Sequence, residues 1–271
     1  MQHCIICPTS YLEDFATKSK YHLILPHVLQ SDSKYYEFYR KRIREKDFVI
    51  LDNSIFELGT SFDANALLDI AEDLQVSVVV APEAWEDAAE TKKMVLDFIE
   101  LHSSRNCNIP ILAMAQGKNV DEIIGSFFFW NNHSKISYIG LPFSLDFEIE
   151  GVSDNIKSQT LKRVLNRWYL VDRINRYIRA SSQKIVKPTH LMGLSDAVEL
   201  QRYKGDSYYW IHSNDSSSAY IHGKHCIKYT DRGLPCEKIL EKVNFSDSTV
   251  LNTEQYNCIV YNIEKILSWV K

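Results

Sequence analysis

Short apolar segments alternate with longer amphipathic segments along most of the chain. Each apolar segment ends in polar or small residues. Near-continuous apolar runs of this length are typical of strands that are buried on both faces, as in parallel sheets. The segments predicted to be strands are 21–26, 48–52, 76–81, 110–116, 136–142, 189–194 and 208–213.

The intervening segments carry apolar residues at helical spacing, and Ser61 or Asp63 is placed to cap one of them. This alternation favours an α/β fold with parallel strands and predicts a TIM (β/α)8-type barrel, a single domain over 1–271. A doubly wound sheet is the alternative, but no Gly-x-Gly-x-x-Gly loop follows the first strand. The predicted helices are 36–44, 64–74, 85–101, 120–130, 158–180, 196–203 and 254–270, the last of them packing at the C-terminus.

The composition is that of an ordinary globular protein, with 45% hydrophobic and 24% charged residues among 271. It excludes a disordered tail, a collagen-like repeat and a disulfide miniprotein. No apolar stretch reaches the ~18 residues of a membrane helix, and Met1–Cys4 do not resemble a signal peptide. We therefore expect a cytoplasmic protein without a membrane partner.

The six cysteines are expected to be reduced thiols. Cys4 and Cys7 have the spacing of a redox pair, but Cys7 runs into Pro8 and no helix start follows. We interpret both as strand residues at the entrance of the fold.

Polar residues and glycines follow several of the predicted strands, where a TIM barrel places its chemistry. Two aspartates and a glutamate would suit a reaction with an oxocarbenium-like transition state, since one carboxylate stabilises the anomeric carbon and the other moves a proton. An amide and glycine N–H groups would suit a planar heterocycle such as a purine. Taken singly, an Asp after a strand is more often a helix cap or turn former. The residues are Asp52, Asn53, Glu83, Gln116, Gly117, Gly140, Leu141, Gly193 and Asp215.

In order along the chain, these motifs resemble the tRNA-guanine transglycosylase superfamily, from about residue 48 to 220. Leu51-Asp52-Asn53-Ser54 resembles its Asp-Ser-Gly-Gly motif, Ala115-Gln116-Gly117 its Gln-Gly, and His190-Leu191-Met192-Gly193-Leu194 its Tyr-Leu-Met-Gly-Val segment. Three further short matches to the family are Glu83, Gly140-Leu141 and Asp215. Asn53-Ser54 departs from the Gly-Gly of the family. Because the chain is short, it is most similar to the compact branch that inserts 7-deazaguanine derivatives into the DNA of phages and bacteria.

The resemblance implies a glycosyltransferase that replaces guanine in nucleic acid, DNA rather than tRNA, by a base such as 7-cyano-7-deazaguanine. Asp215 would be the nucleophile that forms a covalent sugar intermediate, and Asp52 the general acid/base. The chemistry would require no cofactor. The heterocycle would contact Asn53, Phe56, Glu83, Gln116, Gly117, Gly140, Leu141 and Gly193.

The family's Cys-x-Cys-x-x-Cys zinc motif is absent. His222, His225, Cys226 and Cys236 lie in the corresponding region, but their spacing is not that of a standard structural zinc site, and a plain surface loop is the alternative.

The net charge of −4 argues against a nucleic-acid partner. The helix predicted at 158–180 is nevertheless strongly basic, and contact with a nucleic-acid backbone requires positive charge. A solvated basic face without a partner is the alternative. The residues expected to contact nucleic acid are Lys162, Arg163, Arg167, Arg173 and Arg176.

Three other functions remain open at this stage. One is a tRNA-guanine transglycosylase. Another is a barrel resembling a nucleoside hydrolase or deoxyribosyltransferase, which would use the same carboxylates without the basic helix. The third is a non-catalytic subunit that binds nucleic acid, although such a subunit has no reason to keep both Asp52 and Asp215.

Overall fold

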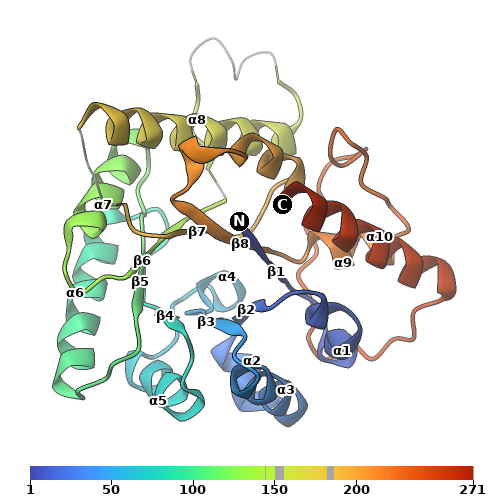
Figure 1. The fold of residues 1–271 in the computed structure, drawn as a ribbon, viewed down its shortest axis with the longest axis horizontal. Helices are drawn as coiled ribbons and strands as arrows, with labels where there is room; N and C mark the ends of the chain where they lie inside the picture. Colours follow the sequence, from blue (N-terminus) through green and yellow to red (C-terminus); the bar gives the residue numbers. More distant parts are fainter. Residues whose placement is uncertain (144, 150–155, 182–185, 271) are drawn as a thin grey trace. The chain divides into compact units, whose positions relative to one another are not determined.

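A computed structural model describes residues 1–143, 145–149, 156–181 and 186–270. In these residues eight strands alternate with helices, and their order in the sheet is β1-β8-β7-β6-β5-β4-β3-β2 (Figure 1). The predicted fold class, an α/β TIM-type barrel, is confirmed. The strands are β1 (Gln2–Ile5), β2 (Tyr21–Ile24), β3 (Phe48–Leu51), β4 (Val78–Val80), β5 (Ile111–Met114), β6 (Tyr138–Leu141), β7 (Thr189–Leu191) and β8 (Ile211–Ser216).

Six of the seven segments predicted as strands contain one, the segment 208–213 overlaps only the first half of β8, and β1 is the strand that the apolar pattern did not mark. Residues 197–203, predicted as an α-helix, form a 3-10 helix instead. The α-helices are α1 (Leu12–Phe15), α2 (Pro26–Ser31), α3 (Ser33–Arg44), α4 (Ile55–Leu58), α5 (Ala64–Leu74), α6 (Ala88–Ser104), α7 (Val120–Asn132), α8 (Gln159–Ala180), α9 (Ser218–Lys224) and α10 (Thr253–Val270). The 3-10 helices are η1 (Thr9–Tyr11), η2 (Ala16–Lys18), η4 (Ala197–Tyr203) and η5 (Asp206–Tyr208).

The chain divides into two compact units, which we describe one at a time. Unit 1 comprises 1–19, 142–186 and 191–271, and unit 2 comprises 20–141 and 187–190. The prediction of a single domain over 1–271 stays a prediction.

Unit 2 contains the parallel strand pairs from β2–β3 to β5–β6. The Val78–Val80 segment that forms β4 is completely buried, as expected for a strand covered on both faces. The ladder continues past the strand ends, because Asp52 N donates to Ile24 O and Ala81 N to Leu112 O. These hydrogen bonds hold the backbone in place directly after the strands, where the predicted polar residues begin.

Side-chain caps start several helices of unit 2. Asp63 accepts a hydrogen bond from Ala66 N at the start of α5, so Asp63 rather than Ser61 is the cap. Asp87 and Asn119 cap α6 and α7 in the same way.

Unit 1 contains β1 paired in parallel with β8, in a register that sets Cys4 beside Asp215. Helix α10 packs along α9 (Figure 1). Gly223 permits this close approach, since a Cβ there would lie 2.5 Å from Ile259 Cγ1. The first strand and the last helices therefore support the strand that carries Asp215.

No helix in the described part of the chain is long and apolar enough to span a membrane.

A substitution at Gly140 on β6 tests how tightly the strands of unit 2 pack. A Cβ at this position would lie 2.0 Å from Met114 Sδ and 3.0 Å from Leu112 Cδ2. We expect Gly140→Ala to lower the free energy of unfolding by about 1–3 kcal/mol, because both neighbours are buried. Urea denaturation measures the change.

Gly125 on α7 is the matched control, because a Cβ there would meet no atom within 4 Å. Gly125→Ala should raise stability by about 0.5–1 kcal/mol. Equal effects of the two substitutions would show that β6 tolerates a side chain at Gly140.

Candidate functional site

The segment after β3 turns sharply and presents Asp52, Asn53 and Ser54, all buried. Ser54 has φ 58°, a left-handed conformation in which a side chain is strained. Its N–H donates to Asp52 Oδ2 at 2.9 Å, and its Oγ lies 2.9 Å from His27 Nδ1. The motif that this segment resembles has glycine here, and the serine keeps the glycine-like backbone conformation.

Glu83 follows β4, and its carboxyl group lies between two amides. Asn53 Nδ2 donates to Glu83 Oε1 at 3.1 Å, and Gln116 Nε2 donates to Glu83 Oε2 at 2.6 Å. Ser61 holds the backbone on the other side, since Glu83 N donates to Ser61 Oγ and that hydroxyl donates to Glu83 O. Three strand ends, those of β3, β4 and β5, thus contribute to one buried polar cluster.

The carboxyl group of Glu83 is only 3% exposed. Burial raises the pKa of Glu83 to about 7, although the hydrogen bonds from Gln116 and Asn53 favour the ionised form. Near neutral pH, both protonation states of Glu83 are therefore populated, which is a property required of a general acid or base.

Two exposed aromatic side chains follow the same strand ends. Phe56 on α4 is 42% exposed and Trp85, two residues after Glu83, is 40% exposed. Their ring centroids are 6.2 Å apart, with an interplanar angle of 32°. Large exposed aromatics in contact with each other are typical of binding surfaces.

Gly117, Gly140 and Leu141 have packing roles in the structure. A Cβ on Gly117 would lie 2.6 Å from Glu122 Cβ, so glycine allows α7 to approach. Leu141 is completely buried. Contact of these three residues with a heterocycle stays a prediction.

In unit 1, Asp215 lies within β8 rather than after it. Its Oδ1 accepts a hydrogen bond from Gly193 N at 2.7 Å. Gly193 has φ 58°, and a Cβ there would lie 2.8 Å from Phe143 Cδ1, so two constraints favour glycine. The Asp215 carboxylate is therefore oriented by the turn after β7.

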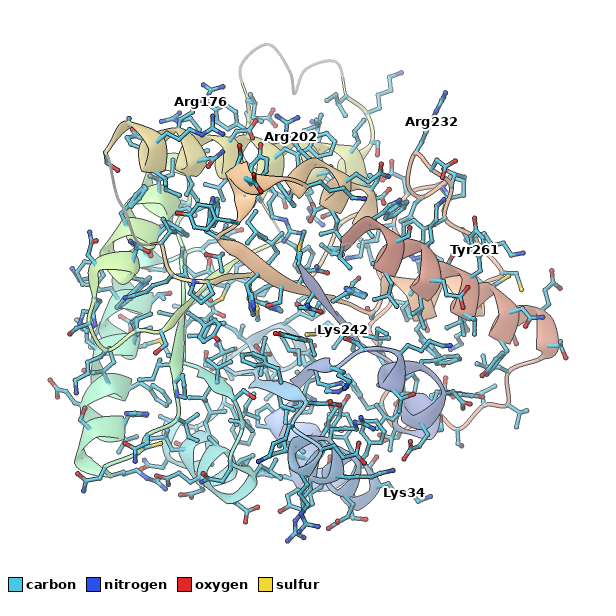
Figure 2. The ribbon with its side chains drawn as sticks, viewed as in Figure 1. Lys34, Arg176, Arg202, Arg232, Lys242 and Tyr261 are labelled. Atoms are coloured by element: carbon cyan, nitrogen blue, oxygen red, sulfur yellow. The ribbon has the colours of Figure 1, made fainter. Side chains whose placement is uncertain are left out.

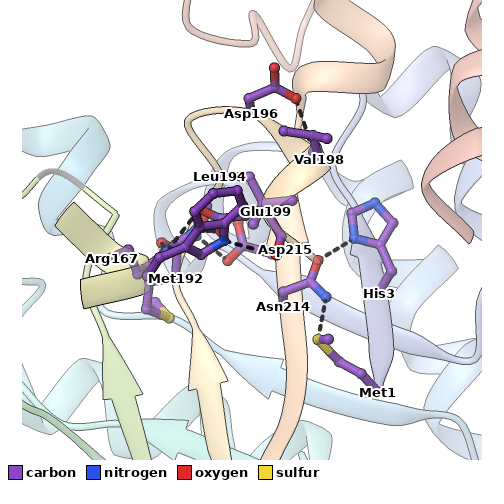
Figure 3. A network of polar contacts seen from close by, with 12 residues as sticks. Met1, His3, Arg167, Met192, Leu194, Asp196, Val198, Glu199, Asn214 and Asp215 are labelled. Atoms are coloured by element: carbon purple, nitrogen blue, oxygen red, sulfur yellow. Dashed lines mark hydrogen bonds and ion pairs between the residues drawn. The ribbon is translucent and has the colours of Figure 1, made fainter. Parts of the chain in front are cut away.

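Arg167 holds that turn through hydrogen bonds to its backbone (Figure 3). Its guanidinium donates to Met192 O at 3.1 Å and Gly193 O at 2.7 Å, and it forms a buried ion pair with Glu199. The sequence predicts Arg167 as a surface contact for nucleic acid. Its position corrects that prediction, because the side chain is 1% exposed and donates into the protein.

Lys238 is a further charged group of unit 1. Its Nζ donates to Leu194 O at 2.5 Å and lies 4.7 Å from the centroid of the Phe143 ring. Burial and Arg167 lower the pKa of Lys238 to about 8, against the opposing charges of Asp215 and Glu199. Asp52 and Glu83 belong to unit 2 and Asp215 to unit 1, so a joint action of Asp52 and Asp215 stays a prediction.

The four metal candidates do not form a cluster. His222 is buried, with Nδ1 3.0 Å from Ser218 Oγ and Nε2 accepting from Ile239 N. His225 pairs with Glu241, while Cys226 and Cys236 are exposed. Across the described residues, no group of three or more His, Cys, Asp or Glu is placed to hold a metal ion. His222 instead ties the loop before Ile239 to α9.

The other basic residues of α8 differ in their surroundings. Arg163 forms a two-bond ion pair with Asp146, and Lys162 lies 4.0 Å from Glu148. Arg173 is half-buried beside two tyrosines, and Arg176 is exposed. Their contact with nucleic acid stays a prediction.

Three residues of interest were missed from the sequence. Trp85 was assigned to a helix, which in fact begins at Ala88. His27 follows the first predicted strand and could have been found by extending the inspection of strand ends to it. Lys238 lies in a segment without helical or strand periodicity, and we find no sequence signal for it.

The sequence matches no family model and no curated protein. Among solved structures, it is similar to N-acetylneuraminate lyase from Mycoplasma synoviae, crystal form II, with 10% sequence identity and a TM-score of 0.44. The match covers 80% of this chain and 68% of that chain.

These findings correct the function expected from the sequence. The solved structure is titled a lyase, and neither sequence comparison supplies a transglycosylase. Exchange of guanine for a 7-deazaguanine, in DNA or in tRNA, is therefore withdrawn, together with the covalent role expected of Asp215.

Proposed function

We propose that this protein is an enzyme that binds a small planar molecule after β3, β4 and β5 and transfers a proton through Glu83. The observation that carries the proposal is the Glu83 carboxyl group, buried between the amides of Asn53 and Gln116. A buried carboxyl group with a pKa near neutrality costs stability when it ionises, and such groups concentrate at active sites.

The location supports the same conclusion, because TIM barrels carry their chemistry at the carboxyl ends of the strands. The strained backbone of Ser54 adds to it, since strain in a buried turn is typical of functional sites. Phe56 and Trp85 supply aromatic faces for a planar ligand. Hydrogen-bonding side chains beside these rings would bind a ligand that has an amide-like edge.

Glu83→Gln tests whether the carboxyl group titrates in the folded protein. The folded pKa is raised from 4.5 to about 7. Stability contributed by the protonated form is thus fully present below about pH 4.5 and is lost as pH rises through 7. From the shift, the unfolding free energy of the wild type should fall by about 3 kcal/mol between about pH 4.5 and pH 8.

Glu83→Gln should lack this decline, whatever its stability at low pH. Urea denaturation across this range measures it, and Glu100→Gln on the exposed face of α6 is the control. A decline that persists in Glu83→Gln would assign it to another group and remove the main support for the proposal.

Ligand binding tests the site itself. We expect saturation-transfer NMR to detect binding of at least one of adenine, guanine, uracil and nicotinamide to the wild type. Binding should change as pH passes through about 7, where Glu83 changes its protonation state. The double substitution Phe56→Ala and Trp85→Ala should abolish it.

Tyr261→Ala is the matched control, since Tyr261 on α10 is 40% exposed, like Trp85. Bound compounds are then followed by NMR for chemical conversion. Conversion that continues undiminished in Glu83→Gln, or binding that survives the double substitution, would contradict the proposal.

A further inference from the structure

Two cysteines of unit 1 come from distant segments of the chain and lie beside each other. Cys226 follows α9 and is exposed, whereas Cys258 on α10 is only 2% exposed. A hydrogen bond joins their side chains. Both are free thiols in the structure, and we call them the thiol pair.

Hydrogen bonds on both sides of the thiol pair fix its position. Gln255 Nε2 donates to Lys224 O at 2.8 Å, and Asn262 Nδ2 donates to Ile227 O at 2.9 Å. The cysteine on α10 is three residues after Gln255 and four before Asn262, so the three side chains share one face of the helix. The other cysteine lies between Lys224 and Ile227. The backbone on both sides of it is therefore bound to the helix face that carries its partner.

The turn at Cys226 is built by the end of α9. Ile227 N donates to His222 O and Cys226 N to Gly223 O, both at 2.9 Å, which is the hydrogen-bond pattern of a Schellman motif. Cys226 has φ 58°, at the position where this motif favours glycine. The helix end therefore sets the backbone conformation of this cysteine.

Two further contacts hold α10 against the same segment. A Cβ on Gly223 would lie 2.6 Å from Ile259 Cα, so the backbones of α9 and α10 are in close contact. Lys228 Nζ lies 5.5 Å from the centroid of the Tyr261 ring, which Figure 2 labels on α10. The segment 222–229 thus packs along 255–262, and this packing keeps the two thiols together without a covalent bond.

The two thiols differ in their access to solvent. Cys226 can meet a dissolved oxidant, whereas the buried Cys258 can be reached from within the protein, through Cys226. Desolvation, the charge of Glu254 and the contact with Cys258 raise the pKa of the Cys226 thiol. Since the thiolate is the reactive form, the reaction of Cys226 should become faster as pH rises.

We propose that the thiol pair is an oxidative modification site, at which a peroxide joins Cys226 and Cys258 in a disulfide. The Cys226 thiolate attacks one peroxide oxygen, the O–O bond breaks, and hydroxide leaves with the thiol proton as water. Cys258 then attacks the sulfur of the resulting sulfenic acid, the S–O bond breaks, and a second water leaves. Two thiols lose two electrons in total, and the peroxide is reduced to two waters.

The disulfide would fasten the C-terminal helix to the end of α9. Helix α10 also packs against β1, which pairs with the strand that carries Asp215. A cross-link between residues 226 and 258 restricts the unfolded chain and so stabilises the folded one. The site lies in unit 1, and the inference does not depend on Glu83 or its ligand.

Mass spectrometry tests the disulfide directly. The intact chain is reduced, treated with hydrogen peroxide, blocked with iodoacetamide and digested with trypsin, whose cleavage after Lys228 and Lys242 separates the two cysteines. We expect their peptides to be joined, to lack two hydrogen atoms, and to separate on addition of dithiothreitol. Oxidised protein should melt about 5–10 °C higher than reduced protein, because of the cross-link.

Cys226→Ser should abolish both the joined peptides and the rise in melting temperature. Cys236→Ser, at the other exposed cysteine, is the matched control and should keep both. Each variant is compared with itself before and after peroxide, so a change in its basal stability does not affect the result. Joined peptides that contain Cys236, disulfide-linked dimers of the chain, or Cys226 recovered only as sulfinic or sulfonic acid would overturn the proposal.

Discussion

The arrangement of unit 2 depends on the burial of one carboxyl group. Glu83 is almost inaccessible to water, so its oxygens must receive hydrogen bonds from the protein. Asn53 and Gln116 supply them from the ends of two neighbouring strands. These hydrogen bonds connect β3, β4 and β5 at their carboxyl ends, while the burial itself raises the pKa of Glu83 to about 7.

Much of the fold follows from the sequence because burial on both faces leaves a clear pattern. The apolar, β-branched run Val78–Val80 is typical of a buried strand, and Asp63 has a side chain that is favoured at a helix start. The apolar pattern did not mark β1, because Gln2–Ile5 mixes polar and apolar residues. Cys4, interpreted as a strand residue, does lie in β1, whereas Cys7 lies after it. His3 is buried in β1 only because its Nδ1 lies 2.6 Å from Asn214 Oδ1, a partner 211 residues away. Pairing at that separation leaves no local signal.

The candidate site was predicted in part for the same reason. Asn53, Glu83 and Gln116 each end a recognisable strand, and parallel strands bring such ends to one edge of the sheet. Arg167 shows where this reasoning stops. The sequence predicts Arg167 as a surface contact on a basic helix, yet the side chain is buried, where it pairs with Glu199 and donates to two backbone carbonyls. A charged side chain can be buried wherever its partners compensate for lost water, and those partners lie in distant segments.

The local charge at each part of the surface matters more than the net charge of the chain. The net charge of −4 includes Glu83, whose burial favours the protonated form, and acids such as Asp146 and Asp172 that are already paired with arginines. Pairing of this kind cancels positive charge at Arg163 and Arg202, while the exposed Arg176 keeps its charge at the surface. The electrostatic field near α8 therefore depends on which arginines have a carboxylate beside them. The net charge of the whole chain says little about that local field.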